Sequence, residues 1–330
     1  MSQGGVTFEI IVVDDHSTDR TREIAAAFPV VRLVNSEPLR DDWTGKNNAL
    51  VAGASVARGE WLLFTDADTF HLPSSLARSV AEAKRQSAGL LSYSPEQEVH
   101  GFSEKAIMPV IFAELALTYR SSKVSDPEDP AAAANGQYIL VRRGVYDSIG
   151  GHAALATNLL EDVALAGRIK QSGNNIVFRY GDDAVRSRMY RSFGQLREGW
   201  TKNLALLFPA SVRLAFARLL EFALIAASAG VLTYAMVAGK MYVGVAAAAI
   251  FAATVARFAA RIRRAHFRWD SNLLAFFGLP VFSYLLLRSK AAHARGRVTW
   301  KGRTYSQRSS APPGNKSPSL PKSGTSYAGQ

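Results

Sequence analysis

Apolar and polar positions divide the chain into two parts of different pattern. Up to about residue 203, short apolar runs alternate with stretches of helical periodicity, which is typical of a sheet with crossover helices. Five runs are expected to be strands: residues 8–13, 31–34, 60–65, 138–141 and 176–178. The pattern therefore predicts an α/β fold class for a domain that spans residues 1–203.

Beyond residue 203 the apolar stretches become much longer, at residues 219–237, 241–256 and 273–287. A spanning helix needs about 20 apolar residues, so the first run qualifies, and the second does so if Arg257 snorkels. We expect residues 204–305 to form a membrane region. Residues 306–330 are rich in Ser, Pro and Gly and are expected to be a disordered tail.

Basic residues set the expected orientation in the membrane. Five arginines lie between the second and third apolar runs, at positions 257, 261, 263, 264 and 268. Basic loops stay in the cytoplasm, so this loop, and the α/β domain two spans earlier, are expected to be cytoplasmic, at the inner membrane of a bacterium. The third run is broken by Gly278 and Pro280 and is followed by further basic residues, so we expect it to be re-entrant or interfacial.

Composition narrows the range of partners. The 330 residues include no cysteine, which excludes disulfide frameworks and thiolate zinc sites. A formal net charge of +12 favours anionic partners, such as nucleic acid, phosphorylated small molecules or lipid headgroups. Many basic residues lie beyond Arg186 among the apolar runs, which favours membrane lipids, and no nucleic-acid-binding signature is present.

Two polar clusters near the amino end are candidate nucleotide-binding segments. Asp14 and Asp15 follow the first strand, at the edge where open α/β sheets bind ligands. A carboxylate there accepts hydrogen bonds from a nucleobase or ribose, although an Asx turn that caps the next helix is an equally good interpretation. Lys46 follows Gly45 at a helix start, where backbone N–H groups bind a diphosphate, but Gly-Lys is also common in ordinary turns.

Two acidic clusters complete the set. Asp66 and Asp68 end the third apolar run, and side chains two apart on a strand share a face. Two such carboxylates suit Mg²⁺ or Mn²⁺, which needs phosphate and water to complete its octahedron; a surface turn is the alternative. Glu161 and Asp162 open a helix that continues to Gln171, where acidic residues also complement the helix dipole.

In this order the four clusters resemble the family 2 glycosyltransferases, which are inverting enzymes with the A-type (GT-A, Rossmann-like) nucleotide-diphospho-sugar transferase fold. The resemblance covers residues 8–205 and extends to the membrane region of a subset of that family. It implies that Asp14 and Asp15 contact the nucleoside of the donor. It also implies that Asp66 and Asp68, as the DxD motif, hold the metal and the donor diphosphate, close to Lys46.

The resemblance implies roles for the remaining candidates. Asp162 is implied to be the general base, beside Glu161 in the ED motif, and Gly136 lines the donor site. Gln195 and Trp200 match two positions of the QxxRW motif of processive members, on the acceptor or membrane side. The arginine of that motif is misplaced here, so single-sugar transfer is expected rather than polysaccharide synthesis.

Three further segments resemble a membrane-bound branch that glycosylates hopanoid- or carotenoid-type lipids: residues 188–193, 198–203 and 298–305. We therefore expect transfer of a sugar from a nucleotide-sugar donor to a lipid acceptor. Asp162 would take the acceptor proton, while Mg²⁺ or Mn²⁺ stabilises the leaving diphosphate. Two alternatives stay open: a nucleotidyltransferase, and a catalytically impaired membrane-interaction protein.

The amino end departs from the family pattern. The family's fold has one more strand ahead of residues 8–13, and this sequence starts without it. Loss of that strand would expose an apolar sheet edge. We expect a start codon upstream of Met1; an impaired product is the other interpretation.

Overall fold

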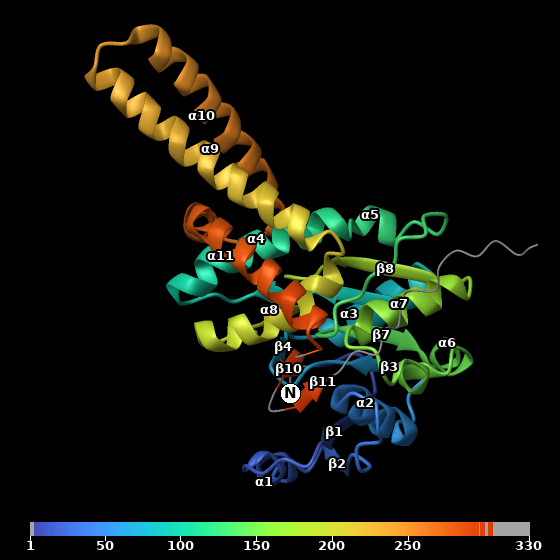
Figure 1. Ribbon diagram of the computed structural model, residues 1–330. Coiled ribbons are helices and arrows are strands. Elements are labelled where there is room, and N and C mark those ends of the chain that lie inside the picture. The colour runs from blue at the N-terminus through green and yellow to red at the C-terminus, as the bar shows by residue number, and fades with distance from the viewer. Residues whose placement is uncertain (1–2, 297, 301–302, 306–330) are drawn as a thin grey trace, which may run out of the picture.

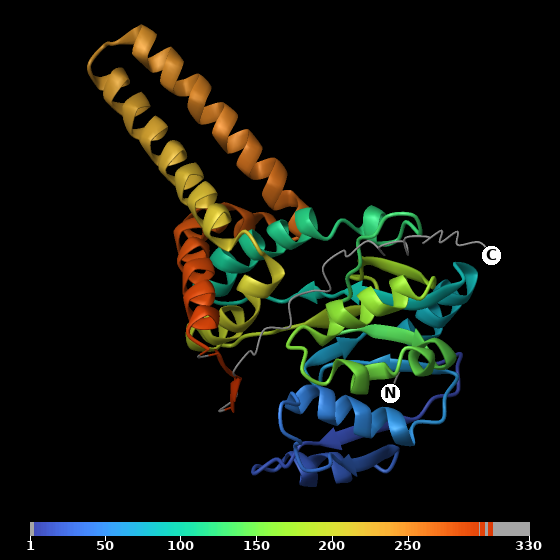
Figure 2. The ribbon, with the colours of Figure 1, turned by 45° about the vertical axis from the view of Figure 1, so that its right-hand side comes forward.

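The computed structural model describes residues 3–296, 298–300 and 303–305. The predicted disordered tail at residues 306–330 lies outside the described residues. Figures 1 and 2 show an α/β body formed by the amino-terminal part, a layer of helices against one side of it, and a long helical hairpin that projects away. The expected fold class, an α/β part followed by long apolar helices, is confirmed, and three such helices are present in the described residues.

A four-stranded mixed sheet forms the centre of the body. Its strand order is β3-β7-β5-β8, made of Trp61–Phe64, Ile139–Arg142, Ala88–Ser94 and Asn175–Tyr180. Strand β7 is antiparallel to β3 and β5, whereas β5 and β8 are parallel. Successive residues of β5 point to opposite faces, so Leu90 packs with helix α7 (Glu161–Gln171) and Leu91 packs with helix α3 (Ser75–Arg85).

Two smaller sheets flank the central one. A parallel pair joins β1 (Ile10–Asp14) to β2 (Val31–Asn35), and helices α1 (Thr21–Ala26) and α2 (Gly45–Val56) accompany it. A three-stranded sheet has the order β4-β9-β6, made of Thr69–His71, Val185–Ser187 and Glu96–Gln97. All five predicted strands are confirmed to within two residues, and the additional strands in the described residues are β4, β5, β6, β9, β10 and β11.

Several short helices, turns and strands complete the fold. They are α5 (Ser121–Val124), α6 (Arg143–Ser148), the 3-10 turn η1 (Gly151–Leu155), a second 3-10 turn η2 (Arg263–Ala265), and the strands β10 (Val298–Trp300) and β11 (Arg303–Tyr305). Strands β10 and β11 pair antiparallel.

Three helices form the layer beside the body: α4 (Phe102–Thr118), α8 (Phe193–Leu207) and α11 (Trp269–Ala294). They share one buried core, in which Leu279 and Phe282 of α11 have no exposed surface. A Cβ atom on Gly278 would lie 1.9 Å from the carbonyl oxygen of Ala106, so α11 and α4 touch backbone to backbone. The predicted break at Gly278 and Pro280 is wrong, because burial against α4 holds α11 in one helix through the proline.

The projecting hairpin consists of α9 (Ser211–Val237) and α10 (Met241–Ile262), joined at Gly239 with a φ of 64°. Helices α9, α10 and α11 are each long and apolar enough to cross a membrane. Only 17% and 11% of the apolar windows of the first two are buried, against 44% for α11. The hairpin therefore presents most of its apolar surface outward.

A cluster of four charges holds the base of the hairpin against α4. Arg261 of α10 contacts Glu114 of α4 at 2.6 Å and Glu221 of α9 at 2.5 Å. Arg218 of α9 lies 2.7 Å from Glu221 and 3.5 Å from Glu114. Arg261 was expected in a basic cytoplasmic loop, but it lies inside α10 with its charge paired, so it adds no net charge to that loop.

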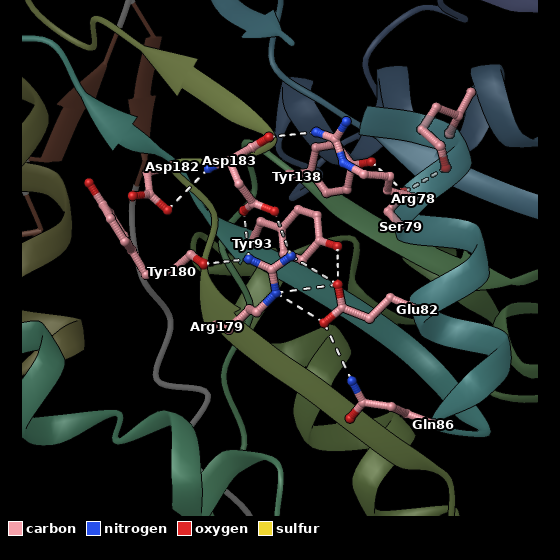
Figure 3. A network of polar contacts seen from close by, with 11 residues as sticks. Arg78, Ser79, Glu82, Gln86, Tyr93, Tyr138, Arg179, Tyr180, Asp182 and Asp183 are labelled. Carbon is pink, nitrogen blue, oxygen red and sulfur yellow. Dashed lines mark hydrogen bonds and ion pairs between the residues drawn. The ribbon is translucent and has the colours of Figure 1, made fainter. Parts of the chain in front are cut away.

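A second polar network fixes α3 to the central sheet (Figure 3). Arg179 of β8 lies 2.9 Å from Glu82 of α3 and 2.8 Å from Asp183, and its guanidinium stacks over Tyr93 at 4.2 Å. The hydroxyl of Tyr93 donates to Glu82 at 2.6 Å. Each charge in this network faces an opposite charge, as expected of a structural contact.

Candidate functional site

The amino-terminal turn of α2 places Lys46. Thr44 caps the helix, since its hydroxyl accepts a hydrogen bond from the Asn47 N–H at 3.1 Å. The Asn47 side chain is fully buried and donates to the Leu155 carbonyl at 2.7 Å, which ties this turn to η1. Lys46 is thus held in the first turn of a helix, as the sequence predicts.

The amino-terminal turn of α7 places the acidic pair. Glu161 is the first residue of the helix and Asp162 the second. Asp162 accepts hydrogen bonds from the N–H of Gly136 at 3.0 Å and from the N–H of Val163 at 2.8 Å. Two backbone donors therefore fix the orientation of this carboxylate.

Gly136 brings its backbone close to both helix starts. A Cβ atom at this position would lie 2.9 Å from Nζ of Lys46 and 3.4 Å from Oδ2 of Asp162. A larger residue would push these groups apart, so the close approach requires glycine.

Lys46 joins the acidic groups into one cluster. Its Nζ lies 2.8 Å from Oε1 of Glu161 and 3.0 Å from Oδ1 of Asp66. Residues far apart in the sequence, Lys46, Asp66, Gly136, Glu161 and Asp162, thereby meet at one place, which we call the donor cluster. The Thr65 hydroxyl, which donates to the Gln137 carbonyl at 2.9 Å, links the loop of Asp66 to that of Gly136.

The pKa values of the neighbouring carboxylates Glu161 and Asp162 are shifted in opposite directions. Burial, and then repulsion from Glu161, raise the pKa of Asp162 to about 6. Burial alone would raise the pKa of Glu161, but Lys46 outweighs it and holds that pKa below its ordinary value. Burial likewise acts to lower the pKa of Lys46, yet Glu161 and Asp66 keep it well above its ordinary value. Asp162 is therefore the group best suited to take a proton near neutral pH.

Asp66 and Asp68 do not lie on a strand. Strand β3 ends at Phe64, and the two aspartates occupy a turn in which the N–H of Thr69 donates to the Asp66 carbonyl at 3.2 Å. The prediction that strand alternation gives them a common face is therefore wrong. Asp66 contacts Lys46, whereas Asp68 lines a cavity of about 160 Å³ with Phe70, Glu98, Arg186, Ser187 and Arg188.

The two aspartates remain candidate oxygen ligands for a metal ion. Within the described residues, no group of three or more His, Asp or Glu side chains forms a complete protein cage for a metal. Mg²⁺ is usually held by one or two carboxylates together with substrate phosphates and water, so two aspartates on an accessible turn fit such an ion. The side chain of Asp66 is 36% exposed.

Asp14 and Asp15 lie at the end of β1, in the separate two-stranded sheet. Asp14 is 5% exposed and accepts a hydrogen bond from the Ser17 N–H at 3.1 Å. Ser36 donates its hydroxyl hydrogen to Asp15 at 2.9 Å. The first contact closes a turn after β1, and the second joins the ends of β1 and β2, so both contacts belong to this small sheet.

Gln195 and Trp200 lie on α8. Ser192 caps α8, because its hydroxyl accepts from the Gln195 N–H at 3.3 Å, and the Gln195 side chain accepts from the Arg191 N–H at 2.9 Å. Trp200 is 3% exposed and packs edge-on to Phe112 in the core shared with α4 and α11. Both residues have clear structural roles at these positions.

Sequence patterns did not single out Lys202, a half-buried residue of α8. Its charge acts on Glu161, Asp162 and Asp66, and burial lowers its pKa more than Glu161 raises it. Lys202 lies on the side of α8 opposite Trp200, which an amphipathic pattern assigns to solvent. Its position shows only when α8 is packed between the helical layer and the body.

Comparison with known proteins identifies the amino-terminal part. Residues 2–150 match the family model of glycosyl transferase family 2. This part of the chain is therefore similar to the family 2 glycosyltransferases. It is 29% identical over 212 residues to the 4,4'-diaponeurosporenoate glycosyltransferase of Staphylococcus haemolyticus, a match that covers 62% of this chain and 56% of the relative. The Staphylococcus aureus enzyme of that name is 27% identical over 211 residues, which cover 62% of this chain and 55% of the relative.

The chain thus spans about half the length of the curated relatives that it matches. Among solved structures, S. aureus TarS matches with a TM-score of 0.37 and 17% identity, over 63% of this chain and 34% of TarS. Glucosyl-3-phosphoglycerate synthase from Mycobacterium tuberculosis, in complex with Mn²⁺, uridine diphosphate and product, matches with a TM-score of 0.38 and 18% identity, over 61% and 68% of the two chains. Both TM-scores are below 0.5, so the assignment of the glycosyltransferase domain rests on the sequence matches.

Proposed function

We propose that this chain is a membrane-bound inverting glycosyltransferase that moves a sugar from a nucleoside-diphosphate sugar to a lipid acceptor. The observation that carries the proposal is the meeting of Lys46, Glu161 and Asp162 at the first turns of two helices. A cation beside helix amino termini suits a diphosphate, and a carboxylate of raised pKa suits a base. The donor cluster therefore has the groups that both halves of the reaction require.

In the proposed reaction the acceptor oxygen attacks the anomeric carbon on the face opposite the diphosphate. The bond from that carbon to the diphosphate oxygen breaks, and the nucleoside diphosphate leaves with the bonding electrons. The acceptor proton passes to Asp162, whose carboxylate is oriented by the N–H groups of Gly136 and Val163. Base assistance of this kind contributes about 10²- to 10⁴-fold to the rate.

Lys46 neutralises the charge that grows on the leaving diphosphate, and its contact with Asp66 places it beside the DxD turn. Asp66 and Asp68 would hold Mg²⁺ or Mn²⁺, and a bound ion supplies further neutralisation of the diphosphate. Asp14 and Asp15 are proposed to contact the nucleoside, and Gln195 and Trp200 to lie on the acceptor side.

The membrane assignment follows from the carboxyl-terminal helices. The α9–α10 hairpin returns the chain to the side on which it left the body, so residues 1–203 and the turn η2 lie on one side of a bilayer. Arg263, Arg264 and Arg268 follow α10, and basic residues favour the cytoplasmic side. The curated relatives are named for a carotenoid-type substrate, which supports a lipid as the acceptor here.

The test is transfer itself. Membranes that contain the full chain are incubated with a panel of radiolabelled nucleotide sugars, and lipid extracts are resolved for labelled product. We expect a labelled lipid with release of nucleoside diphosphate, loss of activity in EDTA, and recovery with Mn²⁺ or Mg²⁺. Release of pyrophosphate would instead indicate a nucleotidyltransferase, and full activity in EDTA would remove the metal assignment.

A negative result has a defined meaning. If no nucleotide sugar gives a labelled lipid, binding of the same donors is measured by calorimetry. Absence of binding would favour the alternative of a catalytically impaired membrane-interaction protein.

A further inference from the structure

The turn at residues 135–137 carries one of the two N–H groups that orient Asp162. The Gly136 N–H donates to Oδ2 of Asp162 at 3.0 Å. The N–H of the next residue, Gln137, donates to Oδ1 of Asn135 at 3.0 Å, which closes a tight turn around Gly136. The orientation of Asp162 therefore depends on what holds this turn in place.

The side chain of Gln137 ties the turn to two strands of the β4-β9-β6 sheet. Its Nε2 donates to the hydroxyl of Ser187 on β9 at 2.7 Å, and its Oε1 accepts from Nε2 of Gln97 on β6 at 3.0 Å. Nε2 of Gln97 also donates to the carbonyl oxygen of Pro95 at 3.3 Å. A carbonyl oxygen can only accept, so the amide of Gln97 and, in turn, that of Gln137 each have one defined orientation.

Gln137 also connects the turn to the two candidate metal ligands. Its carbonyl oxygen accepts from the hydroxyl of Thr65, the residue directly before Asp66, at 2.9 Å. At the other end of the network, Ser187 lines the cavity that Asp68 also lines. Gln137 is therefore bonded to segments on both sides of the turn that carries Asp66 and Asp68.

Burial makes this network costly to break. Gln97, Gln137 and Ser187 are 8%, 5% and 2% exposed, so water does not readily replace a lost partner. A buried polar group that is left unpaired costs about 1–3 kcal/mol. Loss of the network would release the turn, and Asp162 would then lose the Gly136 N–H, one of its two orienting donors.

We propose that Gln137 is a positioning residue of the transfer reaction: its buried amide fixes the turn at residues 135–137, and the turn orients the carboxylate of Asp162 through the Gly136 N–H. This inference rests on the proposed function. In this role Gln137 acts from inside the protein, through the backbone of its neighbour, without contact to the donor or the acceptor.

The first test is the kinetics of transfer by membranes that contain the full chain. Gln137→Met removes both side-chain hydrogen bonds, and kcat should fall about 10-fold, because a small displacement of a reacting group lowers the rate strongly. The KM for the donor should change little. Gln137→Glu should recover part of the loss, since one carboxylate oxygen accepts from Gln97 and the Ser187 hydroxyl can donate to the other.

The matched control removes a buried hydrogen bond from the network of Figure 3. Tyr93 has no exposed surface, and its hydroxyl donates to Glu82 at 2.6 Å. Tyr93→Phe should lower the temperature of thermal unfolding to a similar degree as Gln137→Met, with kcat unchanged. An equal loss of kcat in the two variants would show that Gln137 acts on folding alone, and the inference would be wrong.

The pH profile of kcat separates orientation of the base from general damage. Burial raises the pKa of Asp162 to about 6, and the hydrogen bond from Gly136 acts against this increase. In Gln137→Met the acidic limb of the profile should therefore move to higher pH. The substitution keeps the other titratable groups whose charges interact with Asp162: Glu161 of α7, Lys46 of α2, Tyr119 after α4 and Lys202 of α8. A profile with the wild-type midpoint would contradict the inference.

Hydrogen exchange gives a result that does not need the reaction. The Gly136 amide should exchange about 10-fold faster in Gln137→Met than in the wild-type protein or in Tyr93→Phe. Equal exchange in the three proteins would overturn the inference and leave the proposed function standing. If the wild-type chain transfers no sugar, the proposed function is contradicted, and exchange alone decides whether Gln137 fixes the turn.

Discussion

The α9–α10 hairpin and α11 differ in packing far more than in composition. All three helices are long and apolar enough to cross a membrane, yet 44% of the apolar window of α11 is buried, against 17% and 11% in the hairpin. Val237, Met241 and Tyr242 at the end of the hairpin are at least 70% exposed, whereas Leu279 and Leu285 of α11 are fully buried. Apolar content indicates which helices are removed from water. Packing shows which of these helices is already covered by other parts of the same chain.

The difference has a consequence for function. The hairpin contacts the rest of the molecule in its lower part, through the four-charge cluster of Glu114, Arg218, Glu221 and Arg261 and through apolar packing such as that of Phe222 on Phe276 of α11. Helix α11 contacts α4 and α8 along its length and is bonded to the backbone around Lys202. We therefore expect changes in the hairpin to alter membrane attachment, and changes in α11 to alter the packing of α4 and α8.

The largest effect on stability is expected at the joint between the two regions. Arg261→Met leaves Glu114 and Glu221 with Arg218 alone, and an uncompensated buried charge costs about 3–5 kcal/mol. The free energy of unfolding in detergent measures this. Arg257→Met, at an exposed position of the same helix, is the control, and combining Arg261→Met with Glu114→Leu should recover part of the loss. A cost of less than about 1 kcal/mol for Arg261→Met would contradict the account.

The next effect distinguishes the depth of the hairpin from that of α11. Ile250→Lys places a charge near the middle of α10, where the bilayer centre is expected, and this costs about 2.5–3.5 kcal/mol. We expect a clear loss of protein from the membrane fraction after alkaline extraction. Tyr284→Lys, at an exposed position of α11, should cost much less if α11 lies at the interface, because the lysine reaches water. Equal losses would show that both helices cross the bilayer.

Replacing one glycine in α11 and one in the hairpin should change the stability of the protein in opposite directions. In α11, a Cβ on Gly278 would meet the Ala106 carbonyl oxygen at 1.9 Å, so Gly278→Ala should destabilise the protein by about 1–3 kcal/mol. In α9, a Cβ on Gly230 would meet nothing within 4 Å, so Gly230→Ala should stabilise the helix by up to about 1 kcal/mol. Thermal unfolding of the two variants measures both. Destabilisation by Gly230→Ala would mean that the hairpin is packed against a partner.

The smallest effect is the pH dependence of transfer. Asp162 acts as a base only when its carboxylate is ionised, and burial raises its pKa to about 6. Turnover should therefore be full near pH 8, half of that near pH 6, and lower still in more acidic buffer. Membrane retention of the hairpin should not change over this range. A rate that stays constant down to about pH 4 would contradict the role of Asp162, since that is the range of an ordinary aspartate.

Some of this arrangement could be predicted from the sequence. Apolar runs bounded by turn residues gave the five strands, because burial and turn chemistry are local properties. The helix starts at Lys46 and Glu161 were also predictable from the Gly-Lys and Glu-Asp pairs. Each of these features depends on residues that are neighbours in the chain.

Other features depend on contacts between distant residues. The central strand β5 was missed, although its seven residues include four that are wholly or almost wholly buried apolar or tyrosine side chains. Gly278 and Pro280 predict a break in the helix, but α4 packs against α11 at this point and α11 stays continuous. Nothing in the residues around Lys202 indicates that burial lowers its pKa, because that burial arises from the packing of α8.

The most direct test of the donor cluster compares wild-type protein with Asp162→Asn above pH 7. Donor binding by calorimetry and single-turnover transfer to a lipid hydroxyl are measured on the same samples. The account predicts nearly equal binding, because Lys46 and Glu161 remain in contact, and a transfer rate lower by about 10²- to 10⁴-fold. Transfer by Asp162→Asn at the wild-type rate would contradict the assignment of this cluster as the catalytic centre.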